Sequence, residues 1–232
     1  MQSNHQPWYF NFVRREIEGL LPAYAPRVLE IGCGAGATLA WLRDTGMAAH
    51  TTGIEIDPDA AAVARTRVDT LHEGSVEQWL PRLREDSYDL VLGLDVLEHL
   101  VDPWAAVSRL HQLVRPGGSV IVSLPNIRNH RVLMPLLLRG RWAYTQAGIM
   151  DRTHLRFFTR QTATEMLRQG GFDVDAELAT GIRPGDRDRW KNALTLGLFR
   201  DLFVFQHLMR GVRAVAVPSS VKAPSAELAA VN

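Results

Sequence analysis

The chain has 232 residues, a formal net charge of +1 and 46% hydrophobic residues, values that are typical of a globular protein. A charge so close to zero excludes a strong general attraction to nucleic acid. The single cysteine, Cys33, excludes an intramolecular disulfide and a cysteine-rich metal site, and it fits a reducing compartment. No signal-peptide core lies in residues 1–7 and no apolar run is long enough to cross a bilayer, so we expect a cytoplasmic protein.

The first part of the chain alternates predicted helices with predicted strands. Apolar residues at helical spacing predict a helix over Trp8–Leu21. A β-rich run at Arg27–Ile31 leads through glycines into a predicted helix at Ala37–Asp44. A second strand is expected at Thr51–Ile56, and a helix that begins at Asp57-Pro58 is expected to continue over Ala60–Val68.

The alternation continues through the middle of the chain. The apolar run Tyr88–Leu94 is typical of a strand that is buried on both faces. Asp102-Pro103 begins another helix, which Pro116-Gly117-Gly118 ends and whose buried stripe is predicted to include Trp104, Val107, Leu110 and Val114. A strand is expected at Ser119–Leu124. Strands that alternate with helices in this way indicate right-handed crossovers and a parallel sheet.

The pattern changes after Pro125. Asn126–Phe158 is rich in arginine and aromatic residues and has no clean period, so we expect it to be an insertion that forms a cap over the acceptor site. A helix is predicted at Thr159–Gln169, a strand at Phe172–Leu178, a helical stretch over Trp190–Arg213, and a last strand near Ala214–Val217. These elements predict a Rossmann-like α/β fold with a seven-stranded, mostly parallel, doubly wound sheet. Residues 1–217 would form a single domain and residues 218–232 a disordered tail.

The most informative segment is the glycine-rich turn that follows the first strand. Gly32, Gly34 and Gly36 allow the backbone to turn tightly and to approach a ligand closely. In open α/β sheets such a ligand lies beyond the carboxyl end of the strand. Glu30 places a carboxylate beside this cleft, where it would repel a pyrophosphate but would suit a ligand that carries an ammonium group. The spacing Gly32-x-Gly34-x-x-Ala37 also satisfies a loose dinucleotide fingerprint, so a nicotinamide-dependent reductase remains an alternative.

An acidic residue also closes the second strand. Glu55 lies about twenty residues after the glycines, where a carboxylate can accept hydrogen bonds from both hydroxyls of a ribose. Asp57 is expected to cap the following helix. The alternative for this pair of acids is a purely structural capping role with no ligand.

Together, Glu30, the three glycines and Glu55 resemble the class I S-adenosylmethionine-dependent methyltransferases. The resemblance covers roughly residues 9–178 and implies that S-adenosylmethionine is the methyl donor. It implies that adenine lies near Ser75 and Val76, although an aspartate is usual where this chain has Ser75. The residues that the resemblance implies for the cofactor site are Glu30, Gly32, Gly34, Gly36, Glu55, Ile56, Ser75, Val76 and Leu94.

Two segments resemble a narrower group. Leu124–Arg128 and Asp151–Thr159 are similar to segments of bacterial methyltransferases that occur alongside glycosyltransferases. This resemblance implies a role in polysaccharide or glycosylated-metabolite biosynthesis, with a nucleotide-linked or lipid-linked sugar as one acceptor class. Nothing in the spacing itself indicates a sugar.

Methyl transfer to a hydroxyl requires a base, and histidine is the natural base near neutral pH. His99 follows the fourth expected strand, at the mouth of the cleft, and is our first candidate. His154 and His130 lie in the cap, and Asp151 could orient His154. The alternative for each histidine is a hydrogen-bonded structural role.

The motif Asp95-x-x-Glu98-His99 has a second interpretation. It resembles the metal-binding motif of ubiquinone-pathway O-methyltransferases, with Asp95 in place of the first glutamate. These side chains could hold Mg²⁺ or a similar ion. We favour the simpler interpretation, in which no metal is bound and Leu97-Glu98-His99 begins a helix.

The cap region is strongly basic, because Asp151 is its only acid. Guanidinium groups suit phosphate and carboxylate, so an anionic acceptor is one interpretation and a solvated basic surface is the other. The apolar stretches Val132–Leu138 and Leu194–Met209 could rest on a membrane surface, pack together, or form a homodimer interface. The arginines concerned are Arg128, Arg131, Arg139, Arg141, Arg152, Arg156 and Arg160.

The sequence therefore predicts methyl transfer from S-adenosylmethionine to a hydroxyl oxygen of a small or glycosylated acceptor. Nitrogen is the less favoured acceptor atom. Besides the reductase, a non-catalytic subunit that binds the cofactor and serves a partner protein is a further alternative.

Overall fold

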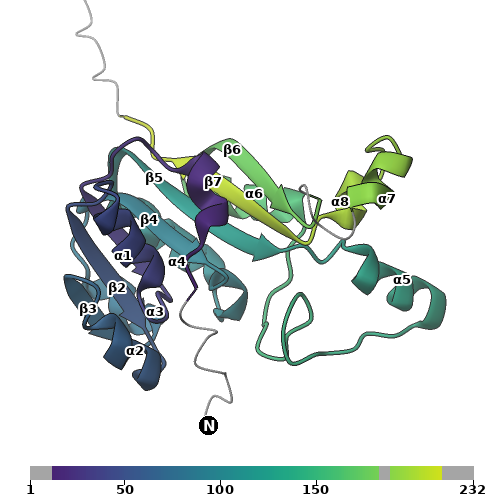
Figure 1. Cartoon of the computed structure of the whole chain (residues 1–232), viewed down its shortest axis with the longest axis horizontal. Helices are drawn as coiled ribbons and strands as arrows, with labels where there is room; N and C mark the ends of the chain where they lie inside the picture. The colour runs from purple at the N-terminus through teal and green to yellow at the C-terminus, as the bar shows by residue number, and fades with distance from the viewer. Residues whose placement is uncertain (1–11, 183–188, 216–232) are drawn as a thin grey trace, which may run out of the picture.

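A single seven-stranded sheet forms the centre of the computed structural model, which describes residues 12–182 and 189–215 (Figure 1). The strand order is β3-β2-β1-β4-β5-β7-β6, and all neighbours pair in parallel except β7, which is antiparallel to β5 and to β6. This architecture confirms the predicted α/β fold. The strands are β1 (Arg27–Ile31), β2 (His50–Glu55), β3 (Thr70–Glu73), β4 (Tyr88–Leu94), β5 (Val114–Pro125), β6 (Asp173–Thr180) and β7 (Gln206–Val212).

Helices cover both faces of the sheet and enclose two hydrophobic clusters. The cluster on one face includes side chains of η1, α1 and α2, and the cluster on the other face includes side chains of α3, η2, α4 and α6. The helices are η1 (Arg15–Leu20), α1 (Ala37–Asp44), α2 (Pro58–Ala64), α3 (Val76–Trp79), η2 (Leu80–Arg82), η3 (Leu97–His99), α4 (Pro103–Leu113), α5 (His130–Arg139), α6 (Arg160–Gln169), α7 (Arg189–Leu194) and α8 (Arg200–Phe203).

Several local predictions are confirmed because short-range chemistry decides them. All seven residues of β4 are buried, as its apolar run predicts. The Asp57 side chain accepts hydrogen bonds from the amides of Asp59 and Ala60, and so caps α2. Asp102 accepts from the amide of Ala105 at the start of α4.

Other local predictions are wrong. Within the described residues, the helix expected over Trp8–Leu21 is only the short η1, which buries Ile17 and Leu20 while Phe12 remains exposed. Trp104, expected in the buried stripe of α4, is 43% exposed because it lies to one side of the buried face, which is formed by Pro103, Ala106, Val107, Leu110 and Leu113.

The expected helical stretch over Trp190–Arg213 is also wrong. It divides into α7, α8 and the strand β7, which inserts between β5 and β6. Leu208 and Met209 are buried in the sheet, so tertiary burial decides the conformation of an apolar run that periodicity leaves ambiguous. The last strand therefore ends before the expected Ala214–Val217. The predicted tail, residues 218–232, lies outside the described residues.

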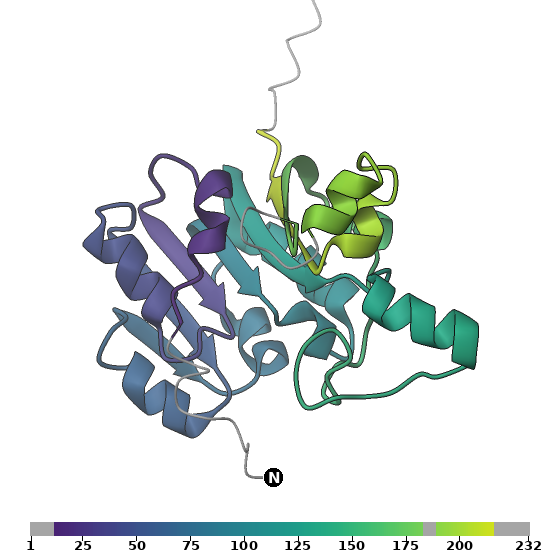
Figure 2. The ribbon, with the colours of Figure 1, turned by 45° about the vertical axis from the view of Figure 1, so that its right-hand side comes forward.

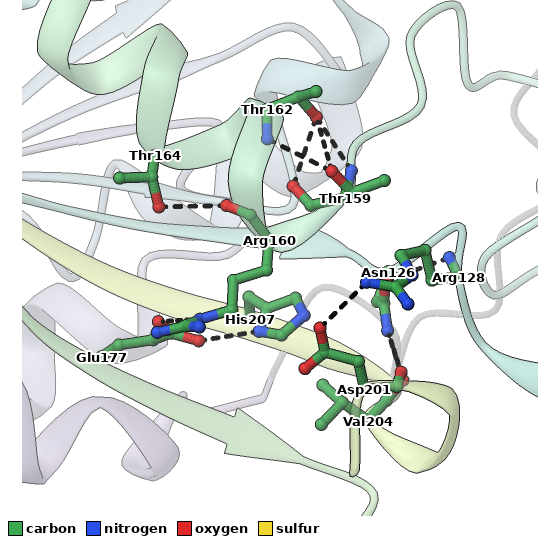
Figure 3. Close-up of polar contacts among 10 residues, drawn as sticks. All are labelled: Asn126, Arg128, Thr159, Arg160, Thr162, Thr164, Glu177, Asp201, Val204 and His207. Carbon is green, nitrogen blue, oxygen red and sulfur yellow. Dashed lines mark hydrogen bonds and ion pairs between the residues drawn. The ribbon is translucent and has the colours of Figure 1, made fainter. Parts of the chain in front are cut away.

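The cap begins and ends at one point, at the carboxyl end of the inner strand β5. Asn126 and Phe158 form a parallel bridge, and the Ile127 amide donates to the Phe158 carbonyl at 2.9 Å. The buried Asn126 side chain donates to the carbonyls of Asp201 (2.7 Å) and Val204 (3.0 Å), which ties the start of the cap to α8 (Figure 3). The cap is therefore an insertion with a fixed base.

Helix α6 starts directly after the cap and is held on the sheet by a polar chain (Figure 3). Thr159 caps the helix by accepting from the Thr162 amide at 3.2 Å. The Arg160 guanidinium donates to the Glu177 carboxylate at 2.6 Å. The other carboxylate oxygen of Glu177 lies 3.0 Å from Nδ1 of the buried His207 ring. These contacts join α6 to β6 and β7.

Candidate active site

The glycine turn after β1 has the left-handed backbone that it requires. Gly32, Gly34 and Gly36 have φ angles of +64°, +54° and +73°, a region that side chains with a Cβ rarely adopt. A Cβ on Gly32 would also lie 2.4 Å from a methyl carbon of Val96, and one on Gly36 would lie 2.9 Å from Val68. At Gly32 and Gly36, glycine is thus required by the protein's own packing, in addition to the tight turn and the close approach to a ligand that the sequence predicts.

Glu55 holds this turn in place. One carboxylate oxygen accepts a hydrogen bond from the Gly34 amide at 2.7 Å, and the other accepts from the Asp57 amide at 2.8 Å. Burial raises the pKa of Glu55, and these amide donors act in the opposite direction. Its role toward a ribose remains a prediction, and the structure adds a second role in shaping the loop.

Glu30 is a buried carboxyl group that lacks a complete set of partners. It is 3% exposed, and its Oε2 atom has no hydrogen-bond partner among the described residues. Burial raises its pKa to about 8, although the nearby Arg14 guanidinium lowers it. An orphaned buried oxygen beside the glycine turn fits an ammonium group, which would supply the missing donor.

The remaining predicted cofactor residues lie at neighbouring strand ends. Leu94 is the last residue of β4, and Ile56 follows β2 and is 69% exposed. Ser75 caps α3 by accepting from the Gln78 amide at 3.2 Å, and Val76 is buried at the start of that helix. These four residues lie at or just after the carboxyl ends of β2, β3 and β4, and their contacts with the cofactor remain predictions.

Sequence reasoning missed a polar network that links the N-terminal segment to β7. The Arg14 guanidinium donates to Asp95 Oδ2 at 2.8 Å and to Ser123 Oγ at 3.2 Å. Ser123 and Gln206 donate to Asp95 Oδ1. Asp95 itself has a φ of +58°. No local signal could identify these partners, because they lie 28 to 111 residues from Asp95 in the chain.

His99 and His154 lie together at the mouth of the site. Their ring centroids are 4.7 Å apart at an interplanar angle of 77°. His99 Nδ1 lies 3.2 Å from the Thr153 carbonyl, and His154 Nδ1 lies 3.0 Å from the Ile149 carbonyl. Because a carbonyl only accepts, both Nδ1 atoms carry hydrogen, and the neutral rings have their lone pairs on Nε2.

The environment of His99 favours its neutral form. Burial lowers its pKa, and the neighbouring His154 lowers it further. The Asp151 carboxylate accepts hydrogen bonds from the Thr153 amide (2.8 Å) and hydroxyl (2.7 Å), while His154 Nδ1 faces the Ile149 carbonyl. The prediction that Asp151 orients His154 by a hydrogen bond to that ring nitrogen is therefore wrong. His130, the third candidate, lies against α8, where its Nδ1 is 3.0 Å from the Leu202 carbonyl.

Glu98 lies beneath the two histidines. It is 1% exposed, and neither of its carboxylate oxygens has a partner in the part of the chain that the structure describes. Burial, followed by the charge of Asp95, raises its pKa well above the usual value. Its backbone carbonyl accepts from the amides of Leu155 (2.8 Å) and Arg156 (3.0 Å), which fastens the cap to the loop after β4.

The donor set at this point fits a divalent metal, but its composition differs from the metal motif that the sequence offered as an alternative. Ligand atoms of Glu98, His99 and His154 all lie within 4.8 Å of one another. Asp95 is not part of this group, because its carboxylate is engaged by Arg14, so the predicted triad with Asp95 is wrong. Two imidazoles and one carboxylate suit transition metals such as Zn²⁺ better than Mg²⁺, which prefers oxygen ligands.

An open cavity adjoins the histidine pair. Its volume is about 480 Å³, and it is lined by Tyr144, Arg152, His154 and Leu155. The Arg152 side chain is exposed and makes no ion pair with any described residue. The cavity thus combines an aromatic ring, an aliphatic side chain and a guanidinium beside a candidate base.

Comparison with known proteins identifies the family. Residues 5–177 match the family model described as a methyltransferase domain. A ubiquinone biosynthesis O-methyltransferase of Aromatoleum aromaticum is 30% identical over 165 residues, which are 68% of this chain and 68% of that protein. The corresponding enzyme of Aeromonas salmonicida is 30% identical over 63% of this chain and 61% of its own length.

Solved structures agree on the fold. An S-adenosylmethionine-dependent methyltransferase from Archaeoglobus fulgidus has a TM-score of 0.62 at 19% identity, with 89% of this chain and 94% of that chain covered. One from Mesorhizobium loti has a TM-score of 0.60 at 18% identity, with 85% and 96% covered. The reductase alternative is therefore wrong, and the chain belongs to the methyltransferase-domain family of S-adenosylmethionine-dependent enzymes.

Proposed function

We propose that the protein transfers a methyl group from S-adenosylmethionine to a hydroxyl oxygen of a small acceptor, with His99 as the base. The observation that carries this proposal is a pair of adjacent histidines with Nε2 lone pairs: His99 follows β4, and His154 lines the open cavity. The orphaned Glu30 oxygen and the glycine turn supply the place for the cofactor. Bound S-adenosylmethionine supplies an activated methyl group.

The protein's own residues have a limited task in this reaction. The cofactor's methyl group is already activated, so the protein mainly aligns the acceptor oxygen and removes its proton. His99 Nε2 accepts that proton, and the lowered pKa of His99 keeps the ring neutral at physiological pH. The Thr153 carbonyl holds the ring in the tautomer with its lone pair on Nε2. His154, which lines the cavity, is the alternative base.

Two observations guide the acceptor class. The curated relatives described above are O-methyltransferases by name, which supports oxygen as the methylated atom. The Arg152 guanidinium on the cavity, which makes no ion pair with any residue that the structure describes, supports an acceptor with a carboxylate or phosphate group. A glycosylated acceptor is the finer hypothesis, and it rests only on the resemblance of two cap segments to methyltransferases that occur alongside glycosyltransferases.

Turnover on matched acceptors tests this function. Mass spectrometry measures the methylated product. We expect methylation of hydroxy acids or phosphorylated alcohols, and little methylation of the same alcohols without the anionic group. Arg152→Gln should raise KM for the anionic acceptors and leave the affinity for S-adenosylhomocysteine unchanged. Methylation confined to amines would contradict the hydroxyl assignment.

A metal-assisted version of the same reaction is the second candidate, because the two buried Glu98 oxygens have no hydrogen-bond partner among the described residues and lie beside two imidazoles. We favour the metal-free version, and we expect EDTA to leave the initial rate unchanged. Loss of activity in EDTA that Zn²⁺ or Mn²⁺ restores would establish the metal-assisted version. Glu98→Gln should then abolish that restoration.

A further inference from the structure

The large apolar side chains with the greatest exposure are concentrated in two short segments. Among the described residues, the five most exposed all lie at the end of α5 or from the end of α7 into the loop before α8. These five, with the exposed fraction of each side chain, are Leu196 (96%), Leu198 (80%), Leu137 (73%), Leu194 (73%) and Leu138 (72%). All other described large apolar residues are less exposed.

The two segments have little role in the core. Helices α7 and α8 bury none of their side chains, and α5 buries only Val132. Yet α5 is not detached, because Val132 packs with Ile149 and Met150. His130 joins it to α8 through the Leu202 carbonyl and a ring contact with Phe203 at 5.6 Å. Both segments project from the same end of the molecule, beyond the sheet (Figures 1 and 2).

The charge on this unit is almost entirely positive. Arg139 and Arg141 lie at the end of α5, and Arg189 and Arg200 begin α7 and α8. None of these four makes an ion pair with another described residue. The only acid within residues 130–144 and 189–203 is Asp201, which already pairs with Arg128 at 3.3 Å.

We propose that residues 130–144 and 189–203 form a docking surface for a membrane that contains anionic lipids. The exposed leucines would enter the interfacial region, and the arginines would contact lipid phosphates. The aromatic residues Trp142, Tyr144 and Trp190, which are 40–60% exposed, suit the boundary between headgroups and acyl chains.

A second copy of the chain is the less suitable occupant. A two-fold symmetric dimer would place this surface against itself, with like charges facing each other and Asp201, which already pairs with Arg128, as the only acid in these two segments. No helix in the described ranges is long and apolar enough to cross a bilayer. Peripheral binding fits both the exposed leucines and the uncompensated arginines.

Vesicle flotation tests the proposal with the full chain. The probes are vesicles of phosphatidylcholine alone and of phosphatidylcholine mixed with phosphatidylglycerol. We expect binding to the mixed vesicles, weaker binding at high salt, and at least tenfold weaker binding to the neutral vesicles. Equal binding to both compositions, or binding to neither, would overturn the proposal.

Paired variants separate the two contributions. Leu196→Ser with Leu198→Ser should weaken vesicle binding at least tenfold, because two apolar side chains no longer leave water. Arg139→Glu with Arg141→Glu should weaken it by about fivefold or more for each charge and remove most of the salt dependence. Tyr24→Ser with Val63→Ser, which changes exposed apolar residues elsewhere, is the matched control and should bind as the wild type does.

Folding and activity provide independent readouts. Each variant should retain the wild-type affinity for S-adenosylhomocysteine and the wild-type turnover of a water-soluble acceptor, so failure of the proposed function cannot be mistaken for failure of this surface. Sedimentation measurements address the rival occupant. One outcome would make the membrane proposal wrong and the surface a protein interface. In that outcome the wild type is a dimer that does not bind vesicles, and the double substitution Leu196→Ser with Leu198→Ser makes it a monomer.

Discussion

Cofactor binding should control the ionisation of Glu30. Burial raises the pKa of this carboxyl to about 8, so it is mostly protonated at pH 7 in the ligand-free protein. An ammonium group at its orphaned oxygen would favour the carboxylate and lower that pKa. We therefore expect S-adenosylhomocysteine binding at pH 7 to release about one proton, and the affinity to rise with pH until about pH 8.

Calorimetry in buffers with different ionisation enthalpies measures this proton release. Glu30→Gln is the control: the variant should bind more weakly and release no proton at this site. Proton-neutral binding by the wild type at pH 7 would show that the ligand's ammonium group does not meet Glu30.

Glu55 combines two roles at one position, because its carboxylate shapes the glycine turn and closes the expected ribose site. Glu55→Ala should weaken S-adenosylhomocysteine binding by about 1–3 kcal/mol, since the Gly34 and Asp57 amides lose their acceptor. Glu73→Ala removes an acid at the same end of the neighbouring strand and should have little effect. Affinities within twofold for wild type and Glu55→Ala would indicate that neither role matters for binding.

At the scale of elements, the base of the cap depends on Asn126. Its buried amide makes two hydrogen bonds to α8 and its neighbourhood and accepts a third from the Arg128 amide. Asn126→Ala leaves these groups without that partner, so we expect the free energy of unfolding to fall by about 1–3 kcal/mol. Urea denaturation measures this change. Arg139→Ala, at an exposed position of the same cap, is the control, and an equal effect of the two substitutions would contradict the assigned role of Asn126.

The elements differ in how well the sequence predicts them. The caps at Asp57 and Asp102 and the buried strand β4 depend on neighbouring residues, and the structure confirms them. Strand β7 could not be predicted, because Leu208 and Met209 suit a helix or a strand equally well. This segment forms a strand because it fills the place between β5 and β6, where it pairs with both.

At the scale of the whole molecule, the order of strands and helices predicts the sheet, and the strands predict that the proposed cofactor residues lie at the carboxyl end of the sheet. The set of residues that meet around His99 was harder to predict from the sequence. His154 reaches Glu98 because the cap folds back and hydrogen-bonds to the Glu98 carbonyl. Likewise, Arg14 reaches Asp95 across the carboxyl end of the sheet. Such contacts join distant parts of the chain, and no local pattern records them.

The measurement that tests the central claim most directly is the pH dependence of methyl transfer to a hydroxyl acceptor, compared between the wild type and His99→Ala. Only the neutral imidazole accepts a proton, and the pKa of His99 is lowered by burial. We therefore expect kcat/KM of the wild type to rise with pH and to level off by about neutral pH. His99→Ala should lower turnover by about 10²–10⁴-fold and leave S-adenosylhomocysteine affinity unchanged. A pH-independent wild-type rate, together with near-normal turnover by His99→Ala, would contradict the claim that His99 is the base.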